Sequence, residues 1–133
     1  MAVVVLDAGH GGSDLGATYQ GRQEKDDTLA LTLAVGRLLA ENPDIDVVYT
    51  RGTDVYDTPL VKARKANAAN ADYFVSIHRN STPVPSTYSG VETLVYSKGT
   101  LAETLARNIA SALSAIGFAD LGTTERKKLT VLK

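Results

Sequence analysis

Short apolar segments alternate along the chain with longer segments of helical periodicity, and this alternation limits the fold more than any other feature. We expect four strands, at 3–6, 46–49, 73–77 and 91–96. We expect three helices, at about 25–41, 59–69 and 100–117. Strands that are joined by helices pair in parallel, so the first three strands should be parallel. The pattern therefore predicts an α/β fold, a single domain with a mainly parallel twisted sheet and helices on both faces.

Specific residues mark the ends and faces of these helices. Thr58 followed by Pro59 predicts an N-cap and a proline at the first helical position. Thr100 and Glu103 have the spacing of a capping box. The first helix is expected to bury one apolar stripe, which is formed by Leu31, Ala34, Val35, Leu38 and Leu39.

Composition excludes several classes of function. The 133 residues suffice for one domain, and 44% apolar with 22% charged residues is typical of an ordered globular chain. The 14 basic and 15 acidic residues give a net charge of -1, so no nucleic-acid partner is expected. Since the chain has no cysteine, a metal would have to be bound by His, Asp or Glu. No apolar run approaches the roughly 20 residues of a transmembrane segment, and we expect no signal peptide within this sequence.

Three potential metal ligands follow from the expected topology. His10 lies four residues after the first strand, His78 directly follows the third, and Glu24 stands at the entrance of the first helix. The carboxyl ends of parallel strands meet at one edge of a sheet, where chemistry collects in α/β folds. Two histidines and one carboxylate form the ligand set of a hydrolytic zinc site. The alternatives are hydrogen-bonding loop residues for the histidines and a helix cap for Glu24.

The glycine-rich segment 9–23 contains five glycines and is expected to be a loop with several unusual backbone angles. Because this loop follows a strand, a phosphate-binding role is an alternative. However, Asp14 stands where a dinucleotide fingerprint has its third glycine, and no Gly-Lys-Ser/Thr sequence follows. A loop that carries Asp14 and leads to Glu24 is a poor phosphate site, so the metal-binding interpretation is preferred.

Five sequence blocks follow one another at a distinctive spacing. They are 7–17 (DAGHGGSDLGA), Glu24-Lys25, Thr50-Arg51 with Asp54, Arg64 with Ala66-Asn67, and 76–80 (SIHRN). In this order, and over nearly the whole chain, the blocks resemble the zinc-dependent N-acetylmuramoyl-L-alanine amidases with an amidase 3 catalytic domain. The resemblance implies that 1–133 is an amidase catalytic domain and that His10, Glu24 and His78 bind Zn²⁺.

The same resemblance implies a substrate and a location. The reaction would be hydrolysis of the amide between the lactyl group of N-acetylmuramic acid and the L-alanine of the stem peptide. The partner would be peptidoglycan, recognised as a muramyl peptide. The protein would be a secreted cell-wall hydrolase or autolysin, acting in an extracellular, periplasmic or cell-wall location.

Other residues of the matched blocks have two interpretations each. Asp7 and Asn80 flank the expected ligands and are candidates to orient them, although Asp7 is equally a strand end. For Arg51, Asp54 and Arg64, a buried ion-pair cluster between loop and helix is favoured over substrate contact. Asn67 has the same two interpretations, and the structural one is again favoured.

The catalytic acid/base residue of the family is a second glutamate in a Val-Glu-x-Gly-Phe-like block, and the resemblance places it after Lys133. Glu92 matches a different family position and is a candidate to support the ligands or contact the substrate, so the catalytic acid/base is not assigned. We therefore expect the catalytic domain to be incomplete at its C-terminus and weakly active. An exposed sheet edge would favour a dimer or an aggregate.

Two other functions remain open on the sequence alone. One is a zinc module that binds peptidoglycan but is catalytically impaired. The other is a zinc amidohydrolase of the carboxypeptidase-like type, which would need an Arg or Asn set to hold a free carboxylate. The sequence assigns no such set.

Overall fold

The computed structural model describes residues 1–79 and 90–133. The chain forms two compact units, Met1–Ser81 and Thr82–Lys133, which are described one by one. Asn80, a candidate to orient the ligands, lies outside the described residues. Among the described residues, no helix combines the length and the apolar character that crossing a membrane requires.

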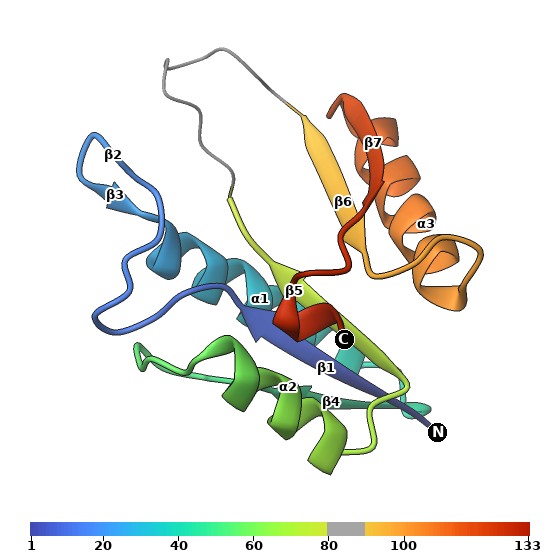
Figure 1. Ribbon diagram of the computed structural model, residues 1–133, viewed down its shortest axis with the longest axis horizontal. Coiled ribbons are helices and arrows are strands. Elements are labelled where there is room, and N and C mark those ends of the chain that lie inside the picture. Colours follow the sequence, from blue (N-terminus) through green and yellow to red (C-terminus); the bar gives the residue numbers. More distant parts are fainter. Residues whose placement is uncertain (80–89) are drawn as a thin grey trace. The chain divides into compact units, whose positions relative to one another are not determined.

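The first unit is built on a three-stranded sheet in the order β4-β1-β5 (Figure 1). Its strands are β1 (Ala2–Ala8), β4 (Ile45–Tyr49) and β5 (Tyr73–Ile77). The central β1 pairs in parallel with both neighbours, which confirms the prediction for the first three strands. The carboxyl ends of β1 and β5 therefore lie at the same edge, with Ala8 opposite Ile77.

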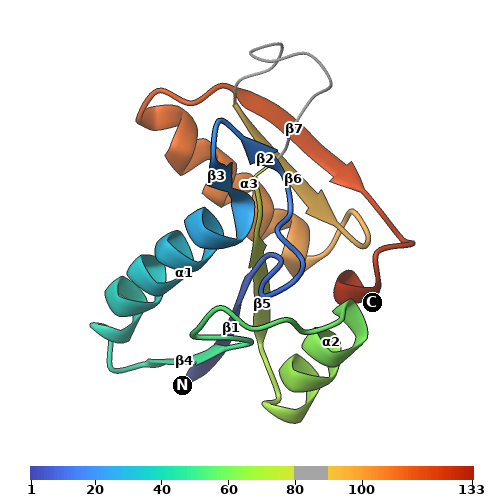
Figure 2. The ribbon, with the colours of Figure 1, turned by 90° about the vertical axis from the view of Figure 1, so that its left-hand side faces the viewer.

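Helices cover both faces of this sheet. Figure 2 shows α1 (Glu24–Ala40) on one face and α2 (Pro59–Ala68) on the other. Neighbouring residues of a strand point to opposite faces, and Val5 and Leu6 of β1 are both almost completely buried. This is the pattern of a parallel strand that is covered on both sides. As predicted, Thr58 caps α2 by accepting a hydrogen bond from the backbone N–H of Val61.

The predicted buried stripe of α1 is wrong at Leu31 and Leu38, whereas Ala34, Val35 and Leu39 are half-buried. Leu31 and Leu38 are 53% and 66% exposed, whereas the fully buried positions on the inner face include Thr28, Thr32 and Gly36. The reason lies in close packing: a Cβ added to Gly36 would stand 1.9 Å from the hydroxyl oxygen of Tyr49. Small residues are needed where the helix lies this close to β4.

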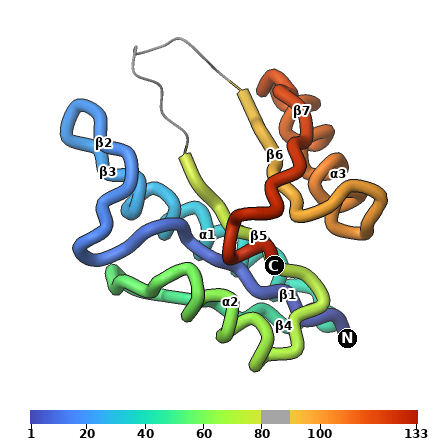
Figure 3. The backbone as a smooth tube through the Cα atoms, in the orientation of Figure 1, coloured from blue at the N-terminus to red at the C-terminus, as the bar shows by residue number. Residues whose placement is uncertain are grey.

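The glycine-rich segment between β1 and α1 has the unusual backbone that was expected, since His10, Gly12 and Gly16 all have φ between 54° and 68°. It also contains a two-stranded antiparallel hairpin of β2 (Thr18–Tyr19) and β3 (Arg22–Gln23), which was not predicted. Figure 3 follows the backbone from β1 through this hairpin into α1.

The second unit contains β6 (Val91–Val95), α3 (Leu101–Ala115), β7 (Asp120–Glu125) and a 3₁₀ turn at Thr130–Leu132. β6 and β7 pair in parallel. The predicted cap of α3 is present, because Thr100 accepts a hydrogen bond from the N–H of Glu103. Strand β7 was not predicted, since its sequence DLGTTE has little apolar character.

Candidate metal centre

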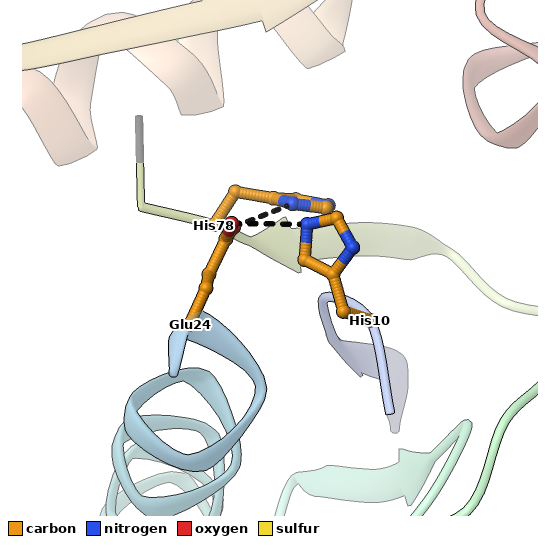
Figure 4. A group of neighbouring side chains, drawn as sticks. All are labelled: His10, Glu24 and His78. Atoms are coloured by element: carbon orange, nitrogen blue, oxygen red, sulfur yellow. Dashed lines mark hydrogen bonds and ion pairs between the residues drawn. The ribbon is translucent and has the colours of Figure 1, made fainter. Parts of the chain in front are cut away.

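Three residues from different parts of the sequence converge at the carboxyl edge of the sheet. His10 lies in the loop after β1, Glu24 is the first residue of α1, and His78 follows β5 directly. One ligand atom from each residue lies within 4.8 Å of the other two. Figure 4 shows the carboxylate of Glu24 pointing toward both imidazole rings. The predicted convergence is thus confirmed.

The carboxylate of Glu24 occupies the centre of the group. Its Oε2 lies 3.1 Å from Nε2 of His10, and its Oε1 lies 3.1 Å from Nδ1 of His78. The same two oxygens accept backbone hydrogen bonds from Ala17 at 2.8 Å and from Arg79 at 2.9 Å. The side chain is 4% exposed, so each oxygen is held from two directions inside the protein.

The charge of Glu24 is favoured by these neighbours. Burial raises the pKa of the carboxyl group, but the N–H groups of Ala17 and Arg79 and the electrostatic interaction with His10 and His78 outweigh burial and lower it. Glu24 therefore stays ionised near neutral pH, which is the form that binds a metal.

Asp14 orients the imidazole of His10. Its Oδ2 lies 2.9 Å from Nδ1 of His10, which leaves Nε2 facing Glu24. Its Oδ1 accepts a hydrogen bond from the N–H of Gly16, and its backbone closes a turn with Gly11 through two hydrogen bonds. A carboxylate behind a histidine is the usual support of a metal ligand. The sequence analysis missed this role, although an Asp four residues after a His in a tight turn was a usable signal.

Two glycines allow the backbone to lie against the ligands. A Cβ on Gly9 would stand 2.5 Å from the ring of His78. A Cβ on Gly16 would stand 2.5 Å from Cδ2 of His10 and 2.7 Å from Oε2 of Glu24. Since side chains at these positions would displace His10, Glu24 or His78, the loop is shaped around this cluster.

The expected buried ion-pair cluster of Arg51, Asp54 and Arg64 does not form. Arg51 is 4% exposed, but it donates to backbone carbonyls, among them those of Ala8, Gly9 and Lys25. Arg64 and Asn67 are exposed on α2, and within residues 1–79 and 90–133 neither has an ion pair or a side-chain hydrogen bond.

Asp54 pairs instead with Lys25, at 2.7 Å, and accepts the N–H of Gly12. Lys25 in turn donates to the carbonyl of Gly12. Arg51 and the Lys25–Asp54 pair together tie the loop that carries His10 to the start of α1.

Of the two interpretations of Asp7, its contacts agree with a structural role at the end of β1. It is 1% exposed and accepts hydrogen bonds from Thr50 at 2.6 Å and Ser76 at 2.7 Å, and it pairs with Lys62 at 3.0 Å. None of its partners in the described residues is a candidate ligand. Asp7 therefore links β1 to the residue that follows β4, to β5 and to α2, and it does not contact the candidate ligands. Glu92 is exposed on β6, in the second unit.

The donor set defines the chemistry of the group. Two imidazole nitrogens and one carboxylate oxygen suit a divalent metal, and this set is found in hydrolytic zinc sites that keep a position open for water or substrate. The ionised Glu24 and the Asp14-supported His10 fit such an ion. The cluster is therefore a candidate metal-binding group.

Comparison with known proteins agrees with this chemistry. A family model described as N-acetylmuramoyl-L-alanine amidase matches residues 4–133. The sporulation-specific N-acetylmuramoyl-L-alanine amidase of Bacillus subtilis is 37% identical over 125 residues, which are 92% of this chain and 48% of that protein. The endolysin of Bacillus phage SPP1 is 48% identical over 81 residues, which are 61% of this chain and 30% of the endolysin. The chain thus spans about half or less of these relatives.

Solved structures show the same fold. The N-acetylmuramoyl-L-alanine amidase of Clostridium difficile 630 matches with a TM-score of 0.91 and 34% identity, over 98% of this chain and 72% of that chain. The catalytic domain of CwlV from Bacillus (Paenibacillus) polymyxa matches with a TM-score of 0.88 and 34% identity, over 100% of this chain and 74% of that chain. From its matched length, its fold and its cluster of His10, Glu24 and His78, the chain belongs to the N-acetylmuramoyl-L-alanine amidase family of the amidase 3 type.

Proposed function

We propose that His10, Glu24 and His78 bind one zinc ion, and that the protein hydrolyses the amide between N-acetylmuramic acid and L-alanine in peptidoglycan. The observation that carries this proposal is the convergence of the three ligand atoms within 4.8 Å. Membership of the amidase family supports the choice of substrate.

The residues around the cluster have separable tasks. A bound zinc ion would supply Lewis acidity toward the carbonyl and a water of lowered pKa. Asp14 keeps Nε2 of His10 aimed into the site. The N–H groups of Ala17 and Arg79 keep both oxygens of Glu24 in place. With two neutral imidazoles and one carboxylate, a site that holds zinc would keep one positive charge. This charge would help to polarise the carbonyl group of the scissile amide.

Protonation of the leaving amine needs a further acid, and we assign that role to no residue of this chain. Activity assays are therefore designed for the natural full-length protein. Since the substrate lies in the cell wall, we propose that the protein acts outside the cytoplasmic membrane.

The test compares two glutamates that both lie in the first turn of a helix, Glu24 of α1 and Glu103 of α3. Glu24→Gln is expected to lose the single bound zinc ion, because it removes the only charged ligand, and to lose hydrolysis with it. Glu103→Gln should keep both. Zinc is measured by elemental analysis, and hydrolysis by the appearance of free L-alanine N-termini from purified peptidoglycan. Full zinc content and activity in Glu24→Gln would overturn the proposal.

A further inference from the structure

Two arginines share one aspartate beside the metal centre. Asp27 of α1 accepts a hydrogen bond through Oδ1 from Arg22 of β3, at 2.9 Å, and pairs through Oδ2 with Arg79. Arg79 directly follows His78 in the sequence. Arg22 and Arg79 thus form an arginine pair that shares Asp27.

The arginine pair lies close to the candidate ligands. Asp27 follows Glu24 by three residues, which puts both on the same side of α1 about 4.5 Å apart along its axis. Arg79 also donates its own backbone N–H to Oε1 of Glu24, at 2.9 Å. A molecule bound at the metal centre would therefore pass near the two guanidinium groups.

The pair carries more positive charge than its aspartate neutralises. The side chains of Arg22 and Arg79 are 68% and 42% exposed, whereas that of Asp27 is 29% exposed. Each guanidinium has five N–H donors, and among residues 1–79 and 90–133 Asp27 is the only side-chain acceptor of either. The neighbouring acid Asp26 is exposed and, by helical spacing, lies about 100° further around α1.

We propose that the arginine pair binds a carboxylate in the peptide part of the substrate, an inference that rests on the proposed amidase function. Guanidinium groups match carboxylates through paired N–H donors. In a muramyl peptide, the lactyl carboxyl is consumed by the scissile amide and the sugar nitrogen is acetylated. The carboxylates of this unit therefore lie in the peptide, on the leaving-group side of the bond.

This binding differs from a purely structural ion pair in its dependence on the substrate. A structural pair would affect every substrate equally, whereas a carboxylate-binding pair would distinguish an acidic peptide from its amide. Because both guanidinium groups are partly exposed, the contribution should lie at the low end of charge-assisted hydrogen bonds, about ten-fold in affinity.

The experiment uses the zinc-loaded natural full-length protein and two substrates. They are N-acetylmuramoyl-L-alanyl-D-glutamate and the same compound with both glutamate carboxyls converted to amides. The unaltered protein should have a KM about ten-fold lower for the diacid. Arg79→Ala should remove this preference by raising the KM for the diacid. The kcat should change little, because the lost interaction is equally strong in the bound substrate and in the transition state. Arg79→Lys should retain part of the preference.

Two further variants control for indirect effects. Arg107→Ala removes another exposed arginine that is paired with an acid, Glu103 on α3, and should change neither KM. Arg22→Ala tests the second member of the pair without altering the residue next to His78. Zinc content is measured for every variant, since a variant that loses zinc reports on the metal centre.

The outcomes separate this inference from the proposed function. Equal KM values for diacid and diamide in the unaltered protein, or an unchanged preference in both Arg79→Ala and Arg22→Ala, would overturn the carboxylate site. Failure to hydrolyse either substrate would overturn the proposed function. Calorimetric binding of L-alanyl-D-glutamate and of its diamide then decides the carboxylate site without turnover, since the same ten-fold preference is expected in Kd.

Discussion

Removal of Asp14 should weaken metal binding without removing a ligand. The Asp14 carboxylate makes two side-chain contacts: Oδ2 lies 2.9 Å from Nδ1 of His10, and Oδ1 lies 3.2 Å from the backbone nitrogen of Gly16. Asp14→Ala removes both. The first loss frees the imidazole to rotate and lowers its basicity, and the second loosens the turn.

The two lost contacts of Asp14 affect different quantities, metal affinity and the free energy of unfolding. Loss of an outer partner of a metal ligand costs about 10- to 100-fold in metal affinity. Since the Asp14 side chain is 44% exposed, water can replace part of its contact, and we expect a weakening near ten-fold, which is about 1.4 kcal/mol. Loss of the bond from Gly16 should lower the free energy of unfolding of the metal-free protein by about 0.5–1.5 kcal/mol.

A matched control separates these two effects. Asp120 accepts the N–H of Gly122, two residues later, as Asp14 does with Gly16, but it has no histidine partner in the described residues. Asp120→Ala should therefore lose a similar stability and no metal affinity. Zinc affinity is measured by competition with a chromogenic chelator, and stability by urea unfolding of the metal-free protein. If Asp14→Ala and Asp120→Ala bind zinc equally well, the contact between Asp14 and His10 does not contribute to zinc affinity.

Two further substitutions probe the packing around the site. Gly16→Ala should lower the free energy of unfolding by about 2–4 kcal/mol, because the φ of 68° at Gly16 disfavours a side chain and the new Cβ would collide with His10. Gly21 has a φ of 80° but no atom within 4 Å of an added Cβ, so Gly21→Ala should lower it by only about 1 kcal/mol. Equal losses of the two variants in urea unfolding would show that crowding at Gly16 does not matter. For Asp7, burial raises the pKa but the hydrogen bonds from its partners and the charge of Lys62 outweigh it, so the folded-state pKa is lowered. The stability that Asp7 contributes is thus present above the usual carboxyl pKa of about 3.9 and lost as pH falls through the folded-state value. The Tm difference between the unaltered protein and Asp7→Asn should narrow below about pH 4, and a difference that widens with acid would contradict this sign.

The convergence of the candidate ligands could be predicted because it depends on chain topology. His10 and His78 follow strands that pair in parallel, and parallel strands end at one edge of the sheet. No knowledge of side-chain packing is needed for that step. The number of residues after each strand and the direction of the strands were enough to bring both histidines to Glu24.

The inner face of α1 could not be predicted in the same way. Apolar periodicity selected Leu31 and Leu38, but the distance between α1 and β4 selects small residues on the inner face. That distance is decided by Tyr49, a residue on a different element, whose hydroxyl lies where a side chain on Gly36 would be. Periodicity reports which faces of a helix differ, and the partner element decides which one is buried.

The roles of the residues around the candidate ligands also depend on contacts that the sequence alone does not show. Asp7, Asp14 and Arg51 all belong to the blocks that suggested a function, yet Asp14 alone touches a candidate ligand. Asp7 and Arg51 are more deeply buried than Asp14, but Asp7 contacts Thr50, Ser76 and Lys62, and Arg51 donates to backbone carbonyls. A shared motif therefore shows that residues serve one site, whereas the choice between holding a ligand and holding the scaffold depends on rotamers that only the folded chain defines.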